Sequence, residues 1–241
     1  MKKDKLQHLI VGYGEVGNGL SDVLYKKTNV WIFDPGLGFS FKELGDGRYY
    51  DVIHICIPYG KEFSKVVLAW KKNTTKGGMV IVHSTVPVGT CDKLKVIHSP
   101  IRGVHPNLGK GIKTFVKYFG GKDAMKAALM FKKYGCKVLS TNKARDTEAL
   151  KLWDTAQYGW QIVLMKEIHR WCKENRVDFD FVYRIANAHY NDGYKKLGRP
   201  EVVRPFLFYK KGKIGGHCII PNLEMLPGSI SSVIKFRNKK Y

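Results

Sequence analysis

The feature that most constrains this chain is a glycine motif near its start. Six residues with the pattern GxGxxG follow a predicted strand, His8–Val11, and open a predicted helix, Glu15–Lys27. They are Gly12-Tyr13-Gly14-Glu15-Val16-Gly17. The first glycine permits a tight turn, the second lets a pyrophosphate approach the backbone, and the third lets helix and strand pack closely. The free N–H groups at the helix N-terminus favour an anion there, so the motif predicts a dinucleotide-binding loop.

An acidic residue follows at the expected distance. The next predicted strand, Val30–Phe33, ends at Asp34, about 20 residues after the loop, where a carboxylate binds the ribose hydroxyls of a dinucleotide. A carboxylate there repels a 2′-phosphate, so the sequence favours NAD over NADP. The alternative is a glycine turn that binds no ligand.

The first part of the chain alternates short apolar runs with helical segments, which predicts an α/β fold with a doubly wound, mostly parallel sheet of the Rossmann type over residues 1–141. The remaining predicted strands are Asp51–Ile57, Met79–His83, Lys95–His98, Phe115–Phe119 and Cys136–Leu139, and the remaining predicted helices are Glu62–Lys72 and Lys122–Tyr134.

Residues 142–241 are predicted to form a mostly helical second domain with a long central helix. The segment Lys143–Asn175 has no proline and a single glycine, and its apolar residues lie on more than one face. Such a helix is buried on several sides, so we expect it to contact a second subunit in a homodimer. A second helix at about Phe179–Leu197, an irregular stretch at Gly198–Gly228 and a short basic tail are expected to follow.

The charge balance bears on partners. The chain of 241 residues has 42 Lys and Arg against 20 Asp and Glu, a formal net charge of +22, and such a field attracts anions. These cations are spread along the chain without a dense run, so an anionic small substrate is favoured over nucleic acid.

Other features concern location and redox state. No apolar run approaches the ~20 residues that span a bilayer, and the N-terminus lacks the apolar core of a secretory signal, so we expect a cytoplasmic protein without a membrane segment.

The five cysteines include no CxxC pair, which argues against a disulfide framework and a zinc site. Most are expected to be reduced core residues.

Three further segments complete a pattern with the phosphate loop. They are Ile55-Cys56-Ile57-Pro58, Ser84-Thr85-Val86-Pro87-Val88-Gly89-Thr90 and Gly215-Gly216-His217-Cys218-Ile219-Ile220-Pro221-Asn222. In this order, with Lys151 between the second and the third, the segments resemble the UDP-glucose/GDP-mannose dehydrogenase family. The resemblance runs from about Leu6 to about Leu226.

Enzymes of that family oxidise a sugar-nucleotide primary alcohol to a carboxylate with two NAD. The resemblance implies that Cys218 is the nucleophile, which forms a thiohemiacetal and then a thioester. It implies that Lys151 stabilises the developing alkoxide and keeps the thiol acidic. Pro58 and Thr85 would line the nicotinamide end, Thr85 would hold a water, and Ser84 would be a further cofactor-binding residue.

The sequence departs from the family pattern at three polar positions. The family has Asn where this chain has Thr155, Asp where it has Asn222, and Glu where it has Ile101. The amide of Asn222 can orient a water but cannot accept a proton as a base. The water that hydrolyses the thioester would therefore lack the carboxylate that the family provides. Full members also carry a further α/β domain after the cysteine loop, so we expect a short form in which a partner or a smaller substrate replaces that domain.

Two alternatives stay open. A β-hydroxyacid-type dehydrogenase also pairs a Rossmann domain with a helical one, uses a helix lysine, here Lys151, as acid or base, and needs no cysteine. A non-catalytic protein that binds NAD or nucleic acid is the other alternative. Binding to nucleic acid would weaken steeply with salt.

Overall fold

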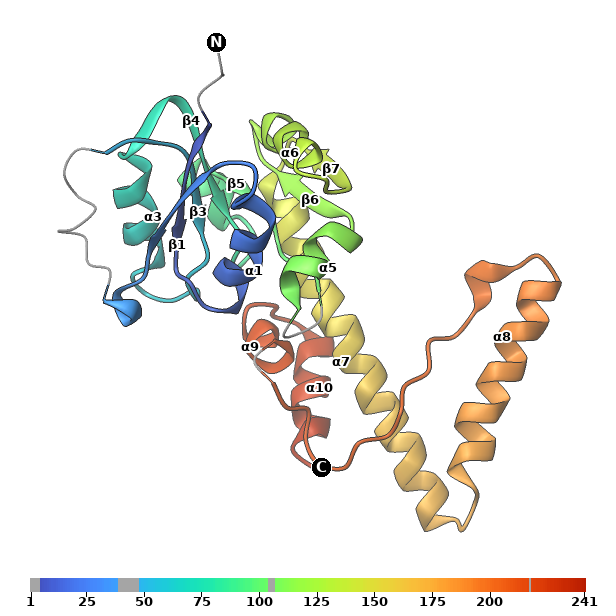
Figure 1. The fold of residues 1–241 in the computed structure, drawn as a ribbon. Coiled ribbons are helices and arrows are strands. Elements are labelled where there is room, and N and C mark those ends of the chain that lie inside the picture. Colours follow the sequence, from blue (N-terminus) through green and yellow to red (C-terminus); the bar gives the residue numbers. More distant parts are fainter. Residues whose placement is uncertain (1–4, 39–47, 104–106, 217) are drawn as a thin grey trace. The chain divides into compact units, whose positions relative to one another are not determined.

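A computed structural model describes residues 5–38, 48–103, 107–216 and 218–241 of the chain. The chain divides into two compact units, Met1–Lys151 and Leu152–Tyr241, and each is described by itself. Figure 1 shows the ribbon of both, with the sheet confined to the first unit.

In the described residues, the first unit is built on one seven-stranded sheet with the order β2-β1-β3-β4-β5-β6-β7. All neighbouring strands are parallel except β5 and β6, which are antiparallel. The strands are β1 (Gln7–Val11), β2 (Asn29–Phe33), β3 (Tyr50–Ile55), β4 (Thr74–Val82), β5 (Ile97–His98), β6 (Lys117–Gly120) and β7 (Val138–Thr141).

Helices cover both faces of this sheet; α1 and α3 lie on opposite sides of it (Figure 1). The helices of the first unit are α1 (Glu15–Leu24), α3 (Phe63–Lys71), α4 (Thr90–Leu94), α5 (Leu108–Thr114), α6 (Ala124–Lys133) and the start of α7 (Ala144–Glu174). A short 3-10 turn, η1 (Pro35–Leu37), follows β2.

The strands supply apolar side chains to both faces in alternation. In β1, Leu9 and Val11 join the core cluster that contains α3 side chains, whereas Ile10 joins the cluster that contains α1 and α6 side chains. The central strands repeat the alternation, as Val80 and Val82 face one cluster and Ile81 the other. Strands buried on both faces are typical of doubly wound sheets, so the predicted Rossmann-type fold is confirmed.

The second unit is helical, as predicted, with two differences of detail. The predicted helix at Phe179–Leu197 consists of a π-helical segment, η2 (Asp180–Ile185), and α8 (Ala186–Lys196). The region predicted to be irregular and then a basic tail contains η3 (Pro200–Val202), α9 (Ile219–Glu224) and α10 (Ser229–Asn238). The last two helices were missed because each is short and starts after glycines that indicate loops.

The core of the second unit joins α7 to α9 and α10. Gly159 of α7 allows the close approach, since a Cβ there would lie 2.9 Å from Ile219 Cγ2. The extended segment after η3 packs on the same helix, where Lys166 Nζ donates to the carbonyls of Lys210 and Gly212. The buried apolar residues of this core are Leu152, Ala156, Val163, Ile214, Ile219, Leu223, Leu226 and Ile234.

One polar row crosses the apolar interior of the first unit. His8 on β1, His54 on β3 and His83 just after β4 are all buried, and their rings form a hydrogen-bonded series. We call these three residues the histidine row. His8 Nδ1 lies 2.9 Å from His54 Nε2, and His54 Nδ1 lies 2.9 Å from His83 Nε2. Because buried polar groups are costly unless paired, this row is a site where protonation opposes folding.

The buried histidines predict that the protein loses stability in mild acid. Burial lowers the pKa of His8 to about 4 and that of His98 to about 3, and it lowers the pKa values of His54 and His83 well below 6.5. As the pH falls from 6.5 towards 4, the unfolded chain therefore binds more protons than the folded chain. Each of these histidines then lowers the free energy of unfolding by about 1.4 kcal/mol for every pH unit.

Urea unfolding at a series of pH values measures this loss. The control is His189→Asn, which removes an exposed histidine on α8 and leaves the buried histidines in place. An unfolding free energy that stays constant over this acidic range would contradict the prediction.

Candidate functional site

The glycine loop lies between β1 and α1, at the carboxyl edge of the sheet. Gly12 has φ +89°, and a Cβ there would lie 2.8 Å from Ile57 Cγ2. A Cβ on Gly17 would lie 2.1 Å from the carbonyl oxygen of Gly12, so only glycine lets α1 start this close to the strand. Gly14 differs, because a Cβ there would meet no atom of the described residues within 4 Å beyond its immediate chain neighbours. The loop therefore leaves open space at Gly14, next to the N-terminus of α1, where the sequence predicts a pyrophosphate.

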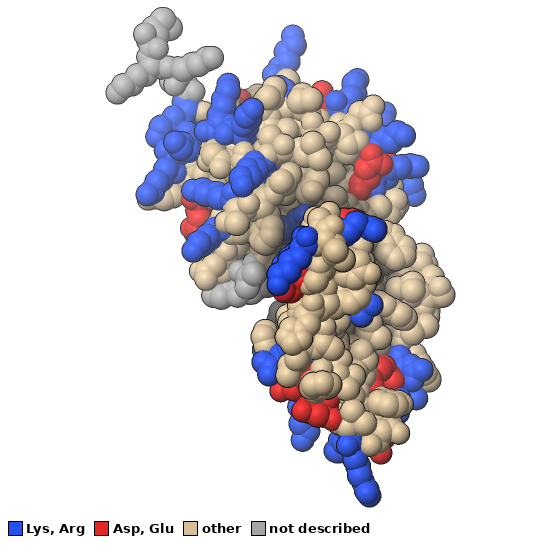
Figure 2. Space-filling model, turned by 90° about the vertical axis from the view of Figure 1, so that its right-hand side faces the viewer, with Lys and Arg blue, Asp and Glu red and all other residues tan. Residues whose placement is uncertain are grey.

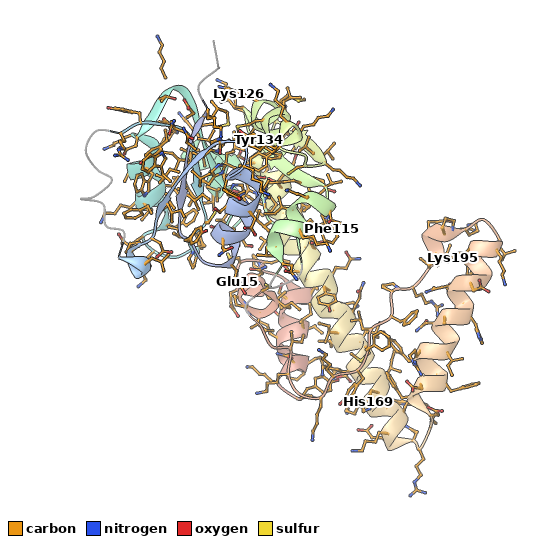
Figure 3. All side chains as sticks on the ribbon, viewed as in Figure 1. Glu15, Phe115, Lys126, Tyr134, His169 and Lys195 are labelled. Atoms are coloured by element: carbon orange, nitrogen blue, oxygen red, sulfur yellow. The ribbon has the colours of Figure 1, made fainter. Side chains whose placement is uncertain are left out.

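Asp34 lies beside this loop, as predicted. Its Oδ2 accepts a hydrogen bond of 2.7 Å from the backbone N–H of Tyr13, and its Oδ1 accepts one of 2.9 Å from Gly36 N–H. These bonds fix the carboxylate at the end of β2 and leave each oxygen a further lone pair for a ribose hydroxyl. Glu15 begins α1 in the same loop (Figure 3).

The predicted nicotinamide-end residues follow the neighbouring strands. The register pairs Val11 with Ile55 and Ile55 with Val82, so β1, β3 and β4 end at the same edge. Ser84 Oγ donates to the carbonyl of Ile57, which ties the segment after β4 to the segment after β3. Pro58 is exposed and Thr85 is partly exposed. The described structure thus brings Gly12–Gly17, Asp34, Pro58, Ser84 and Thr85 to one edge of the sheet, the position where ligands bind in such folds.

A buried carboxylate that the sequence did not reveal holds the loop after β4. Glu148, in the second turn of α7, is fully buried, and it accepts hydrogen bonds from the backbone N–H groups of Gly89 and Cys91. These two N–H groups lie at the N-terminus of α4, so the carboxylate takes the place of a helix cap. Burial raises the pKa of Glu148, while the two N–H donors act in the opposite direction. Nothing in the sequence distinguished this glutamate from a solvated one.

Lys151 lies one turn further along α7. Its Nζ donates a hydrogen bond of 2.9 Å to the carbonyl of Ile101, in the segment after β5. The first two turns of α7 are therefore joined to the segments that follow β4 and β5, through Glu148 and Lys151. This places the ammonium group of Lys151 among the loops at the carboxyl edge of the sheet.

The remaining predicted catalytic residues belong to the second unit. Cys218 is exposed and immediately precedes α9. Asn222 is buried in α9, and its Nδ2 donates to Thr155 Oγ1 of α7 at 3.3 Å, so these two positions do come together. Lys151 and Cys218 lie in different units, and their convergence stays a prediction. His217 lies outside the described residues.

The other cysteines are placed as the sequence predicted. Cys91, Cys136 and Cys172 are buried, and Cys56 is partly buried. Burial raises the pKa of Cys56 to about 12, which keeps its thiol protonated at neutral pH. Cys218 is therefore the most accessible thiol in the part of the chain that the structure describes.

Positive charge is spread over the surface. On the face shown in Figure 2, Lys and Arg side chains are scattered with few Asp and Glu between them. Two arginines of the second unit contact neighbouring side chains. Arg199 forms an ion pair with Glu201, and the guanidinium of Arg204 lies 3.6 Å from the ring centroid of Tyr190. Within the described ranges, no helix combines the length and apolarity that crossing a bilayer requires.

Comparison with known proteins gives structural but no sequence matches. No family model matches the chain, and no curated protein matches it. Among solved structures, the chain resembles UDP-D-ManNAc dehydrogenase from Pyrococcus horikoshii, with a TM-score of 0.76 at 15% identity over 98% of this chain and 68% of that one. It also resembles UDP-glucose dehydrogenase from Pyrobaculum islandicum, with a TM-score of 0.69 at 16% identity over 99% and 69%.

A second group of similar structures is shorter. The 3-hydroxyisobutyrate dehydrogenase of Mycobacterium tuberculosis matches with a TM-score of 0.71 at 14% identity, over 98% of this chain and 93% of that one. The chain thus spans about two thirds of the sugar-nucleotide enzymes and nearly the whole of this hydroxyacid enzyme. At these identities the likeness establishes the shared fold.

Proposed function

We propose that the protein is an NAD-dependent oxidoreductase that oxidises an alcohol or aldehyde group of an anionic sugar derivative, most simply a sugar nucleotide. The observation that carries the proposal is the open space at Gly14, between two glycines that the backbone itself requires and beside the carboxylate of Asp34. The similar solved structures, which are dehydrogenases of sugar nucleotides and of 3-hydroxyacids, support the same reading.

The residues at the carboxyl edge fit a dinucleotide. Backbone N–H groups at Gly14–Gly17 would bind the pyrophosphate, since α1 begins there without a side-chain cap. Asp34 would accept hydrogen bonds from the ribose hydroxyls and would repel the 2′-phosphate of NADP. Pro58, Ser84 and Thr85 would border the nicotinamide. NAD, when bound there, accepts a hydride from the substrate carbon.

Lys151 and Cys218 would carry the chemistry at the substrate carbon. The ammonium of Lys151 would stabilise negative charge that develops on the alcohol oxygen. The thiolate of Cys218 would add to the aldehyde, and the resulting thiohemiacetal would lose a hydride to a second NAD and become a thioester. Water would then displace the thiolate from the thioester. Thr155 and Asn222, which hydrogen-bond to each other, would orient that water, although neither side chain is a base. The cationic surface would attract the anionic substrate.

A hydroxyacid dehydrogenase is the second candidate, and the similarity to the 3-hydroxyisobutyrate enzyme supports it. This chain covers 93% of the 3-hydroxyisobutyrate enzyme but 68% of the UDP-D-ManNAc enzyme. In this alternative Lys151 alone would exchange the proton of the hydroxyl group, and Cys218 would have no role. Nucleic-acid binding without catalysis is the third candidate, supported by the net charge of +22 alone.

Substitution by alanine is expected to affect NAD binding at Gly14 and fold stability at Gly17. Gly14→Ala is expected to leave the melting temperature unchanged, because the added methyl group meets no protein atom, and to weaken NAD binding by about tenfold or more, a cost of about 1.4 kcal/mol. Gly17→Ala is expected to destabilise the fold by about 1–3 kcal/mol, because the methyl group overlaps the Gly12 carbonyl. Thermal unfolding and NAD titration measure both. Unchanged NAD affinity in the Gly14 variant would contradict the proposed cofactor site.

Cysteine replacement separates the two enzyme candidates. The purified full chain is mixed with NAD and a panel of UDP-sugars, GDP-sugars and 3-hydroxyacids, and NADH absorbance is followed. For a sugar nucleotide, Cys218→Ser is expected to abolish carboxylate formation, while Cys172→Ser, at a buried cysteine of the same unit, serves as the control for substitution itself. Full turnover of a hydroxyacid by the Cys218 variant would favour the lysine-only mechanism.

We also propose that the second unit forms a homodimer. No residue of α8 is buried, and large apolar side chains of the same unit are exposed. Trp171 is 55% exposed and Phe181 is 65% exposed. Apolar surface of this extent on helices is typical of a protein interface, and an obligate dimer would cover it.

Substitution on α7 tests the dimer. Trp171→Glu is expected to convert a dimer into a monomer, because a carboxylate would be buried without a partner at the interface. Lys173→Glu, two residues away on the same helix and exposed, is the matched control for the added charge. Light scattering coupled to size-exclusion chromatography gives the mass. A wild-type chain that runs as a monomer at all concentrations would contradict the proposal.

A further inference from the structure

The histidine row continues beyond its three imidazoles at both ends. At one end Tyr134 Oη, in the turn after α6, lies 3.2 Å from His8 Nε2 (Figure 3 labels Tyr134). At the other end His83 Nδ1 lies 2.8 Å from the carbonyl oxygen of Ser99 and 3.3 Å from Lys117 Nζ. Tyr134 is partly exposed, whereas Lys117 is 3% exposed. The series therefore joins a partly exposed hydroxyl to an amine inside the sheet.

The hydrogen bonds fix the direction of the whole series. A carbonyl oxygen only accepts, so His83 Nδ1 carries a proton, and in a neutral ring His83 Nε2 then accepts. His54 Nδ1 must donate to it, and His54 Nε2 accepts in turn from His8 Nδ1. His8 Nε2 is left as an acceptor for the hydroxyl of Tyr134. While Lys117 is neutral, the carbonyl of Ser99 thereby sets the tautomer of all three rings, those of His8 on β1, His54 on β3 and His83 just after β4.

Lys117 is a second group that acts on this series. Its Nζ donates to Ser99 O at 3.2 Å, and the rings of Phe119 and Phe131 lie 5.4 Å from it. The other titratable groups that face it are the thiols of Cys56 and Cys136 and the imidazoles of His83, His54 and His98, while Asp51 acts on the far end of the row at His8. Burial lowers the pKa of Lys117 to about 7, and it raises the pKa values of both thiols, so neither thiol supplies a counter-charge at neutral pH.

We propose that His8, His54 and His83 form a proton wire through which the buried amine of Lys117 exchanges its proton with solvent at Tyr134. When Lys117 is neutral, the series points from Tyr134 towards Ser99, as derived above. To protonate the amine, His83 Nδ1 gives its proton to Lys117 Nζ and takes one at Nε2 from His54. His54 takes one from His8, His8 takes one from Tyr134, and the tyrosine takes one from water.

The net change is one proton moved from solvent to Lys117, and every imidazole ends neutral with its proton on Nε2 in place of Nδ1. No ring has to carry a lasting charge, which agrees with the strongly lowered pKa values of these histidines. His83 Nδ1 lies 2.8 Å from Ser99 O and 3.3 Å from Lys117 Nζ, so both partners are within reach of this nitrogen.

The wire ends beside a segment of the candidate site. Ser99 lies two residues before Ile101, whose carbonyl accepts the hydrogen bond from Lys151. Lys117, which donates to Ser99 O, therefore contacts the same backbone segment as Lys151. A lysine buried at this point would otherwise only cost stability, because desolvation disfavours its charged form.

Long-range proton–nitrogen NMR correlation of the ¹⁵N-labelled full chain reads which nitrogen of each imidazole carries the proton. At about pH 9 the rings of His8, His54 and His83 are all expected to carry their proton on Nδ1. At about pH 5.5 all three are expected to be neutral and to carry it on Nε2. The three tautomer changes are expected to share one midpoint pH, which coincides with the titration of the Lys117 side chain. In Lys117→Met, which replaces the amine by an apolar chain, the rings are expected to stay Nδ1–H throughout.

Tyr134→Phe, at the partly exposed end, provides the second variant. It is expected to keep the fold and to slow hydrogen exchange of the imidazole and Lys117 protons, whereas Tyr158→Phe, an exposed tyrosine of the other unit, leaves the exchange unchanged. Any one of three results would overturn the proposal. They are mixed tautomers at about pH 9 in the wild type, a tautomer switch that persists in Lys117→Met, and unchanged exchange in Tyr134→Phe. None of these measurements uses NAD or a substrate, so the outcome is separate from that of the proposed function.

Discussion

The contact between Gly17 and the carbonyl of Gly12 is the constraint on which the candidate site depends. A side chain at position 17 would overlap that oxygen, at 2.1 Å, so the first helix can follow the first strand this closely only with glycine there. This contact fixes where α1 begins and therefore where its free N–H groups point. Gly14, the second glycine of the motif, has no such constraint, because a Cβ there would meet no atom of the described residues within 4 Å beyond its chain neighbours.

The rest of the carboxyl edge is held by a few polar side chains, of which Ser84 and Glu148 are buried and Asp34 is partly exposed. Asp34 accepts from the glycine loop, Ser84 joins the segments after β3 and β4, and Glu148 holds the loop before α4. Each of these bonds joins parts of the chain that are distant in sequence, so the edge is assembled only when the sheet is complete. Lys151 belongs to the same arrangement through the carbonyl of Ile101. The first two turns of α7 thus contact these loops, whereas the helix from Leu152 onwards belongs to the second unit.

Local sequence signals were sufficient for the loop and the layers of the first unit. Gly12–Gly17 and Asp34 were predicted because a phosphate loop requires particular residues at fixed spacing, and the strands because both faces of each are apolar. Glu148 was not predicted, since a helical glutamate that binds distant N–H groups has no local pattern. The same holds for His8, His54 and His83, whose pairing depends on strand order and register. Helices α9 and α10 were missed because short helices carry a weak periodic signal.

Calorimetric titration of the purified full chain with NAD, and in parallel with NADP, tests the central claim most directly. The account predicts saturable binding of NAD at one site per chain, within the concentration range up to about 1 mM that is usual for such ligands. It also predicts weaker binding of NADP, because Asp34 repels the added phosphate. No saturable heat with NAD, or tighter binding of NADP than of NAD, would contradict the account.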